Sequence, residues 1–199
     1  IDSNNHLKFL YGKANQLAYS SIEKFEEIKS TEINYLYLSR DIQINTSLFY
    51  NQAKNISLFT QKTLGQPNLA TGKQKTKGAE LAIKYKPNYN IETDSSIRLQ
   101  KTDNEIENSS ENFDPDFSPK VLGKFKITYL NKDTRYSLLF DYISKMKSSI
   151  KNGTSTRYGK DSNDNISVST NINHKFNKKL SMDFHITNLL DRDNRTPAG

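Results

Sequence analysis

Charged side chains two residues apart are the strongest candidates for chemistry in this sequence. Asp183 and His185 would share one face of a β-strand, where they could flank a metal ion or a chelate. Five more charged residues have the same even spacing on two neighbouring predicted strands: Glu92, Asp94, Arg98, Lys124 and Lys126. These five could pair with one another, or their cations could attract a negatively charged ligand. The simpler interpretation of all seven is that they are polar residues of a wet interior.

Motifs of common enzymes do not occur. The sequence contains no G-x-S-x-G, no H-E-x-x-H and no phosphate loop. It has no cysteine, which excludes disulfides and thiolate chemistry. We therefore expect no enzyme activity, no metal site and no cofactor. The lysines behind the formal net charge of +7 are scattered rather than gathered in a stripe, so no nucleic-acid partner is predicted.

The elements that would position these residues are β-strands. Along Leu180–Thr187 apolar and polar residues alternate, and successive side chains of a strand point to opposite faces. Gly78 begins one such segment, where a glycine would relieve crowding. Nine segments follow this pattern: His6–Gly12, Thr31–Leu38, Ile42 to about Leu58, Gly78–Lys86, Ile91–Lys101, Val121–Leu130, Thr134 to about Met146, Asn165–Phe176 and Leu180–Leu190.

The connections alternate in length. Short turns rich in Asn, Asp, Gly and Pro centre near residues 40, 88, 132 and 178, and between them come long polar connections: Lys13–Ser30, Thr60–Lys77, Thr102–Lys120 and Lys147–Asp164. Five aromatic residues lie near short turns on the apolar face: Tyr37, Tyr85, Tyr129, Tyr136 and Phe176. Strands of about 9–11 residues cross a bilayer when tilted, and aromatic girdles mark its boundaries. The pattern predicts an all-β, antiparallel transmembrane β-barrel.

The strand count indicates that the barrel is partial. Nine is an odd number, bacterial barrels close with an even one, and lipid does not tolerate open sheet edges. We therefore expect either a missed strand or an incomplete chain, and Ile1 is not an initiator methionine. The mean hydropathy of −0.80 argues against helical membrane spans, since no apolar run approaches the roughly 20 residues that a helix needs.

Four stretches resemble the C-terminal part of the barrel of TonB-dependent outer-membrane receptors. They are, in order, LKFLYGKA from Leu7, STEINYLYLS followed by INTSLFYNQAKNI from Ser30, KGAELAIKYKP from Lys77, and NKKLSMDFHITNLLDRDNRTPAG from Asn177. The last is similar to the family's penultimate strand with its "NLfDk.Yr.P" ending. The resemblance covers nearly the whole chain.

The resemblance implies a barrel of about 22 strands with a plugged lumen. Residues 1–199 would then be a partial barrel that lacks the N-terminal plug and the final strand. The implied function is active uptake of a ferric siderophore or another scarce chelate across the outer membrane of a Gram-negative bacterium. The implied partners are that chelate, the TonB complex through the missing N-terminal part, and outer-membrane lipid. Ligand contacts are expected in the outer loops Thr60–Lys77 and Thr102–Lys120.

Departures from the family pattern limit this prediction. NQLAYSSIEKF, Asn15 to Phe25, stands where the family usually has an "FRAP…ELY" segment, which weakens a haem-receptor interpretation. The chain also stops at Gly199, before the last aromatic-terminated strand of the family. Two alternatives stay open: a passive porin-like channel, and a soluble all-β binding module whose apolar face packs on a second layer.

Overall fold

The computed structural model describes residues 3–16, 25–59, 69–107, 112–113, 115–148 and 160–195. They form ten strands in one antiparallel sheet: β1 (Asn5–Gln16), β2 (Glu26–Leu38), β3 (Ile42–Phe59), β4 (Leu69–Asn88), β5 (Ile91–Ile106), β6 (Asn112–Phe113), β7 (Val121–Asn131), β8 (Thr134–Ile143), β9 (Asn165–Lys175) and β10 (Ser181–Ile186). No helix in this part of the chain is both long and apolar enough to cross a membrane.

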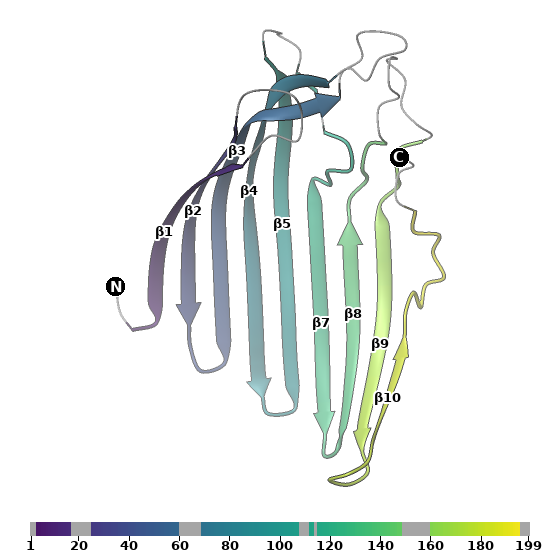
Figure 1. The fold of residues 1–199 in the computed structure, drawn as a ribbon. Helices are drawn as coiled ribbons and strands as arrows, with labels where there is room; N and C mark the ends of the chain where they lie inside the picture. Colours follow the sequence, from purple (N-terminus) through teal and green to yellow (C-terminus); the bar gives the residue numbers. More distant parts are fainter. Residues whose placement is uncertain are drawn as a thin grey trace.

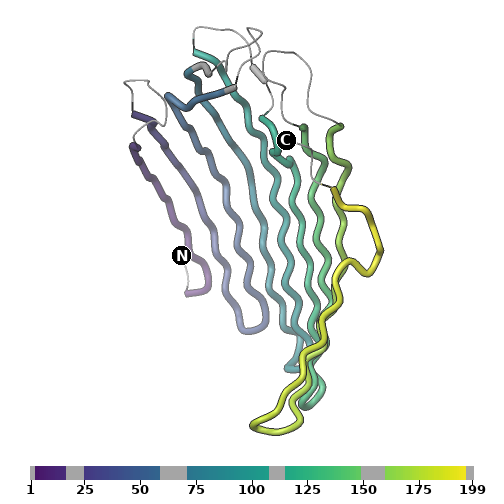
Figure 2. Tube along the Cα trace, turned by 45° about the vertical axis from the view of Figure 1, so that its right-hand side comes forward, coloured from purple at the N-terminus to yellow at the C-terminus, as the bar shows by residue number. Residues whose placement is uncertain are grey.

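The strands follow one another across the sheet in chain order, and only the two-residue β6 lies off this path, paired with β5. The short turns lie at one end and the long connections at the other, as Figure 1 shows. The sheet curves like a segment of a barrel wall (Figure 2). In this order β1 and β10 are its two edges, so the sheet is open and the expectation of a partial barrel fits the structure.

The cross-strand register confirms the two faces that the alternation predicts. One rung of the apolar face runs across six strands: Phe9, Ile33, Leu48, Ala79, Leu99 and Val121 are consecutive register partners from β1 to β7. Leu58 and Met146 are the only apolar side chains that are buried among the described residues. The sheet therefore lacks the packed double layer of a soluble β-sandwich.

The predicted short turns are confirmed. Between β4 and β5 the Asn88 Oδ1 accepts hydrogen bonds from the backbone N–H groups of Asn90 and Ile91, at 2.9 and 3.0 Å. Between β7 and β8, Lys132 adopts a φ of 50°. Between β9 and β10 the Asn177 Oδ1 accepts from the two N–H groups two and three residues later. Such local side-chain bonds are what make asparagine a turn residue.

Four strands extend beyond their predicted bounds into the connections assigned as loops. β1 continues to Gln16, β2 begins at Glu26, β4 begins at Leu69 and β5 continues to Ile106. Here polar residues occupy both faces, so the apolar alternation that marks a strand is absent. Cross-strand polar pairs extend the ladder instead, for example the Oγ1 atoms of Thr76 and Thr102 at 3.0 Å.

Two strands in the C-terminal half of the sheet are shorter than predicted. β8 ends at Ile143 rather than near Met146, and β10 ends at Ile186 rather than Leu190. After β10 the backbone turns because Asn188 adopts a φ of 52°, and its Oδ1 accepts a hydrogen bond from the Arg192 N–H at 3.2 Å. The prediction also missed the bulge at Asn55 in β3, where φ is 57° and the register with β4 shifts.

Aromatic residues near the short turns lie on the apolar face, as the girdle prediction requires. Tyr129 and Tyr136 are register partners with stacked rings 6.4 Å apart. His174, which the sequence analysis did not include, lies on the same face and contacts the Phe176 ring edge-on at 4.5 Å. Rings that are apolar on one side and polar at one end suit a membrane boundary.

Candidate functional site

All seven charged residues that the sequence suggested lie on the polar face of the sheet. Asp94 on β5 is the register partner of Lys126 on β7, and Asp183 on β10 is the register partner of Asn173 on β9. Because side chains two residues apart share a face, the remaining candidates follow from these pairs. They lie on β5, β7 and β10: Glu92, Arg98, Lys124 and His185.

Three of these residues form ion pairs with β4 rather than with one another. The Lys84 Nζ lies 3.8 Å from the Asp94 Oδ2, and the Lys86 Nζ lies 3.0 Å from the Glu92 Oε2. Arg98 faces Glu80 at 3.9 Å. Their side chains are between about a third and two-thirds exposed, so each pair contributes only about 0.2–1 kcal/mol. In the described part of the chain, Lys124 and Lys126 form no ion pair within 4.0 Å.

Arg98 belongs to a stacked cluster that the sequence analysis missed. Its guanidinium carbon lies 4.5 Å from the centroid of the Phe49 ring, and this ring covers the backbone of Gly78. Phe49 is an aromatic residue on the polar face, between Ser47 and Asn51, and alternation alone could have revealed it. Gly78 lies in the middle of β4, so its assignment to the start of a strand was wrong. Its function is to leave room for the ring.

Asp183 is held by two asparagine side chains. The Nδ2 of Asn173 donates to the Asp183 Oδ2 at 2.8 Å, and the Nδ2 of Asn171 donates to the Oδ1. His185 is the register partner of Asn171. The described residues contain no group of three or more His, Cys, Asp or Glu residues placed to hold a metal ion.

The polar face is nearly neutral as a whole. Eight cations lie on it in the described strands: Lys8, Lys84, Lys86, Arg98, Lys124, Lys126, Arg135 and Lys175. Seven carboxylates accompany them: Glu26, Glu32, Glu80, Glu92, Asp94, Asp141 and Asp183. Opposite charges at this spacing largely cancel beyond a Debye length, about 8 Å at physiological salt.

A cavity of about 400 Å³ opens at the outer ends of β5, β7 and β8. Its walls carry charges of both signs, including Lys120, Lys145 and Asp164. The volume is within the range of about 300–1,000 Å³ that is usual for ligand pockets. Ser144 supports one wall, because its Oγ accepts hydrogen bonds from two backbone N–H groups at the start of β7, at 2.9 and 3.0 Å.

The cavity includes both ends of the predicted contact loop Thr102–Lys120, with Thr102, Pro115 and Ser118 in its wall. Half of the other predicted loop, Thr60–Lys77, lies outside the described residues, and the rest of it belongs to β4. The NQLAYSSIEKF segment also lies mostly outside them.

Comparison with protein families gives one match. The model of the family described as "TonB dependent receptor-like, beta-barrel" matches residues 12–189. No curated protein sequence matches the chain.

Solved structures of receptors and transporters share the fold. The unliganded ferric citrate transporter FecA superposes with a TM-score of 0.82 at 15% identity, over 99% of this chain and 33% of its own. The copper transporter OprC gives 0.80 at 16%, over 98% and 33%. The closed form of Fiu, the ferric-catecholate import receptor of E. coli K12, gives 0.76 at 15%, over 98% and 30%. The chain thus spans about a third of the length of these proteins.

Proposed function

Since the chain belongs to the TonB-dependent receptor-like β-barrel family, we propose that it is part of an outer-membrane receptor that takes up a ferric siderophore by active transport energised through TonB. In this proposal a plug precedes the described barrel segment, and a final strand follows it. The apolar face contacts lipid and the polar face lines the lumen, where it meets the plug and the passing ligand.

The main support for this proposal is a band of the apolar face that contains no charged residue, which we call the uncharged band. In the nine long strands, no Lys, Arg, Asp or Glu lies on this face between the short turns and the rung of Leu48, Ala79 and Leu99. A charge facing lipid at mid-depth costs about 2–4 kcal/mol for Arg or Lys, so a lipid-facing band must be free of them. The polar face of the same strands is rich in charge.

The choice of an iron chelate rests on structural neighbours. Two of the three proteins named above are described as transporting or importing a ferric chelate, and one as transporting copper. A copper substrate is therefore the second candidate. The nearly neutral polar face does not itself select an anionic chelate, and the outer cavity with its mixed charges is the better place for ligand contact.

The test is uptake by the full-length receptor in a Gram-negative host that lacks its own siderophore receptors. Cells receive radioactive iron bound to a panel of catecholate, hydroxamate and citrate siderophores, and radioactive copper in a parallel series. We expect uptake of one iron chelate that disappears when the host gene for TonB is deleted. Uptake that persists without TonB would indicate a passive channel. TonB-dependent uptake of copper alone would show that copper, and not an iron chelate, is the substrate.

A further inference from the structure

Charged residues return on the apolar face just beyond the uncharged band, at the end of the sheet that carries the long connections. Seven lysines lie there on the outward side of the strands: Lys13, Lys29, Lys54, Lys73, Lys75, Lys77 and Lys101. Three carboxylates accompany them: Glu27, Asp103 and Glu105. This strong excess of cations contrasts with the balanced polar face, and it lies where a lipid-facing surface would reach the headgroups of the outer leaflet.

The rung nearest the uncharged band places two lysines side by side. Lys77 on β4 and Lys101 on β5 are direct register partners on the same face. Residues opposite each other in an antiparallel pair have Cβ atoms about 4.5–5.5 Å apart, and like charges there are destabilising. One rung farther out the arrangement is different, because Lys75 faces Asp103. Two other lysine pairs face each other on this side of the sheet, Lys13 with Lys29 and Lys54 with Lys73. Carboxylates accompany both pairs: Glu27 forms ion pairs with Lys13 and Lys29, and Lys54 and Lys73 have Glu27 and Glu105 as their other register partners.

The available carboxylates do not neutralise the rung of Lys77 and Lys101. The Lys101 Nζ lies 3.2 Å from the Asp103 Oδ1, so Lys101 is partly balanced. Lys77 forms no ion pair with any residue that the structure describes, and its side chain is exposed. Lys120, just before β7, lines the same hollow as Lys77 and Lys101, and it also lines the cavity at the ends of β5, β7 and β8. An anion bound between these three residues, which we call the lysine arc, would offset their repulsion.

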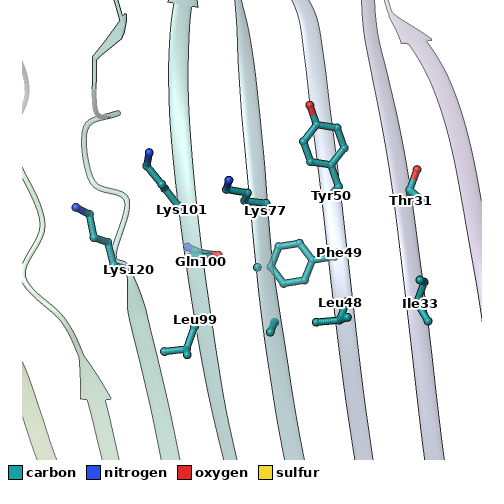
Figure 3. Close-up of a pocket in the computed structure, with 12 residues that line it drawn as sticks. Thr31, Ile33, Leu48, Phe49, Tyr50, Lys77, Leu99, Gln100, Lys101 and Lys120 are labelled. Atoms are coloured by element: carbon teal, nitrogen blue, oxygen red, sulfur yellow. The ribbon is translucent and has the colours of Figure 1, made fainter.

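An apolar hollow lies directly below the lysine arc. Leu48 and Leu99 flank it from β3 and β5, and the small side chain of Ala79 forms its floor. Figure 3 shows the amino groups of the arc along one side of the hollow and the leucines along the other. Leu48 and Leu99 are 54% and 50% exposed, so nothing in the described sheet covers them. The ligand that fits is an amphiphile with an anionic head and a hydrocarbon chain.

We propose that the lysine arc binds a phosphate group of an outer-leaflet lipid and that an acyl chain of the same lipid lies in the hollow over Ala79. This assignment rests on the proposed placement in the outer membrane. Charge-assisted bonds from ammonium groups to phosphate are short and strong. A lysine near an anionic lipid surface contributes about 1 kcal/mol, so loss of the arc corresponds to roughly 100-fold weaker binding, since 1.4 kcal/mol is a factor of ten. Because Lys101 already forms an ion pair with Asp103, the expected loss of binding affinity is smaller, between about 10-fold and 100-fold.

The test is native mass spectrometry of the full-length receptor in detergent, titrated with diphosphorylated lipid A. One variant combines Lys77→Gln, Lys101→Gln and Lys120→Gln. The matched control removes three charges at the short turns, with Lys132→Gln, Lys178→Gln and Lys179→Gln. We expect about 10-fold to 100-fold weaker binding for the arc variant and unchanged binding for the control. Equal binding by both variants would overturn the proposal.

Three further measurements test the phosphate contact, the acyl contact and the membrane placement separately. Lipid A stripped of its phosphates, titrated against the unaltered receptor, should bind at least 10-fold more weakly, and equal binding would exclude phosphate recognition without any variant. Ala79→Phe should fill the hollow and weaken binding of lipid A with the arc intact, and unchanged affinity would exclude the acyl contact. If the unaltered receptor fractionates with soluble proteins, the membrane placement is refuted. If the receptor is membrane-inserted but the arc variant binds lipid A as tightly as the unaltered receptor, only the lipid site is refuted.

Discussion

Substitution of Gly78 by alanine is the sharpest test of the cluster on the polar face. A methyl carbon at this position would lie 2.4 Å from the backbone oxygen of Leu99 and 2.4 Å from the Cζ of Phe49. Both distances are far below van der Waals contact. The ring could swing away, but the carbonyl oxygen belongs to the neighbouring strand, so β4 and β5 would have to shift.

The expected cost follows from these two contacts. Overpacking of this kind typically costs about 1–3 kcal/mol. Displacement of the ring would also disturb the contact with Arg98, which is worth about 0.5–1 kcal/mol at an exposed site. We therefore expect Gly78→Ala to lower the free energy of unfolding by about 1–4 kcal/mol.

Urea unfolding of the full-length receptor in detergent, followed by circular dichroism, measures this cost. Gly123→Ala on β7 is the matched control, because the nearest atom to its added methyl would be the Cβ of Tyr142 at an ordinary 3.6 Å. It should be neutral or stabilising by up to about 1 kcal/mol, since alanine restricts the unfolded chain. Phe49→Ala combined with Gly78→Ala should recover the part of the loss that is due to the ring. Equal unfolding curves for the two glycine variants would refute the packing argument.

Three other substitutions test the faces and the outer ends of the strands. Leu81→Arg should destabilise the receptor in lipid vesicles by about 2–4 kcal/mol, because it places a charge on the face that is proposed to contact lipid. Ala82→Arg on the polar face should change the free energy of unfolding by less than about 0.5 kcal/mol. Equal costs for the two variants would contradict the assignment of the faces. The Glu27 carboxylate lies between two lysines whose hydrogen bonds lower its pKa from 4.5 to about 2, so its stabilisation is complete above pH 4.5 and is lost as the pH falls through about 2. Glu27→Gln should thus lower the urea midpoint at pH 7 and lower it much less at pH 2, and an equal difference at the two pH values would exclude the ion pairs as its cause. Ser144→Ala should cost about 1–3 kcal/mol by removing the acceptor of two N–H groups, and an unchanged urea midpoint would show that water replaces it.

The sequence predicted the strands best where one face is apolar. From Ile91 to Leu99 the alternation is regular, and β5 begins where predicted. The same rule fails from Leu69 to Lys77, because a strand that is polar on both faces has no hydrophobic period. Its pairing with β5 depends on bonds between residues about 30 positions apart, and no local pattern reveals them. One example is the hydrogen bond that the Gln74 Nε2 donates to the Asn104 Oδ1 at 3.0 Å.

The candidate residues were placed correctly on one face, but their partners were not. Alternation fixes which side a residue faces, and the structure has Asp94 and Lys126 on the same face as register partners. It does not specify the register between strands, so the pairing of Asp94 with Lys84 across the β4–β5 hairpin required the structure. The stack of Phe49 on Gly78 was missed for the same reason, since 28 residues separate them in the sequence.

The distribution of charge bears on how a ligand would be drawn to the receptor. The sequence suggested that the cations Arg98, Lys124 and Lys126 could attract an anionic chelate. On the described strands, however, the polar face is almost balanced, and the excess of lysines lies on the opposite face beyond the uncharged band. A field that is nearly neutral inside and positive outside does not steer an anion into the lumen. In the proposed receptor, selection of a chelate would then fall to groups other than those on the polar face of the described strands. In the proposed membrane placement, the outward lysines instead face the layer in which lipid phosphates lie, and there the positive charge would have a partner.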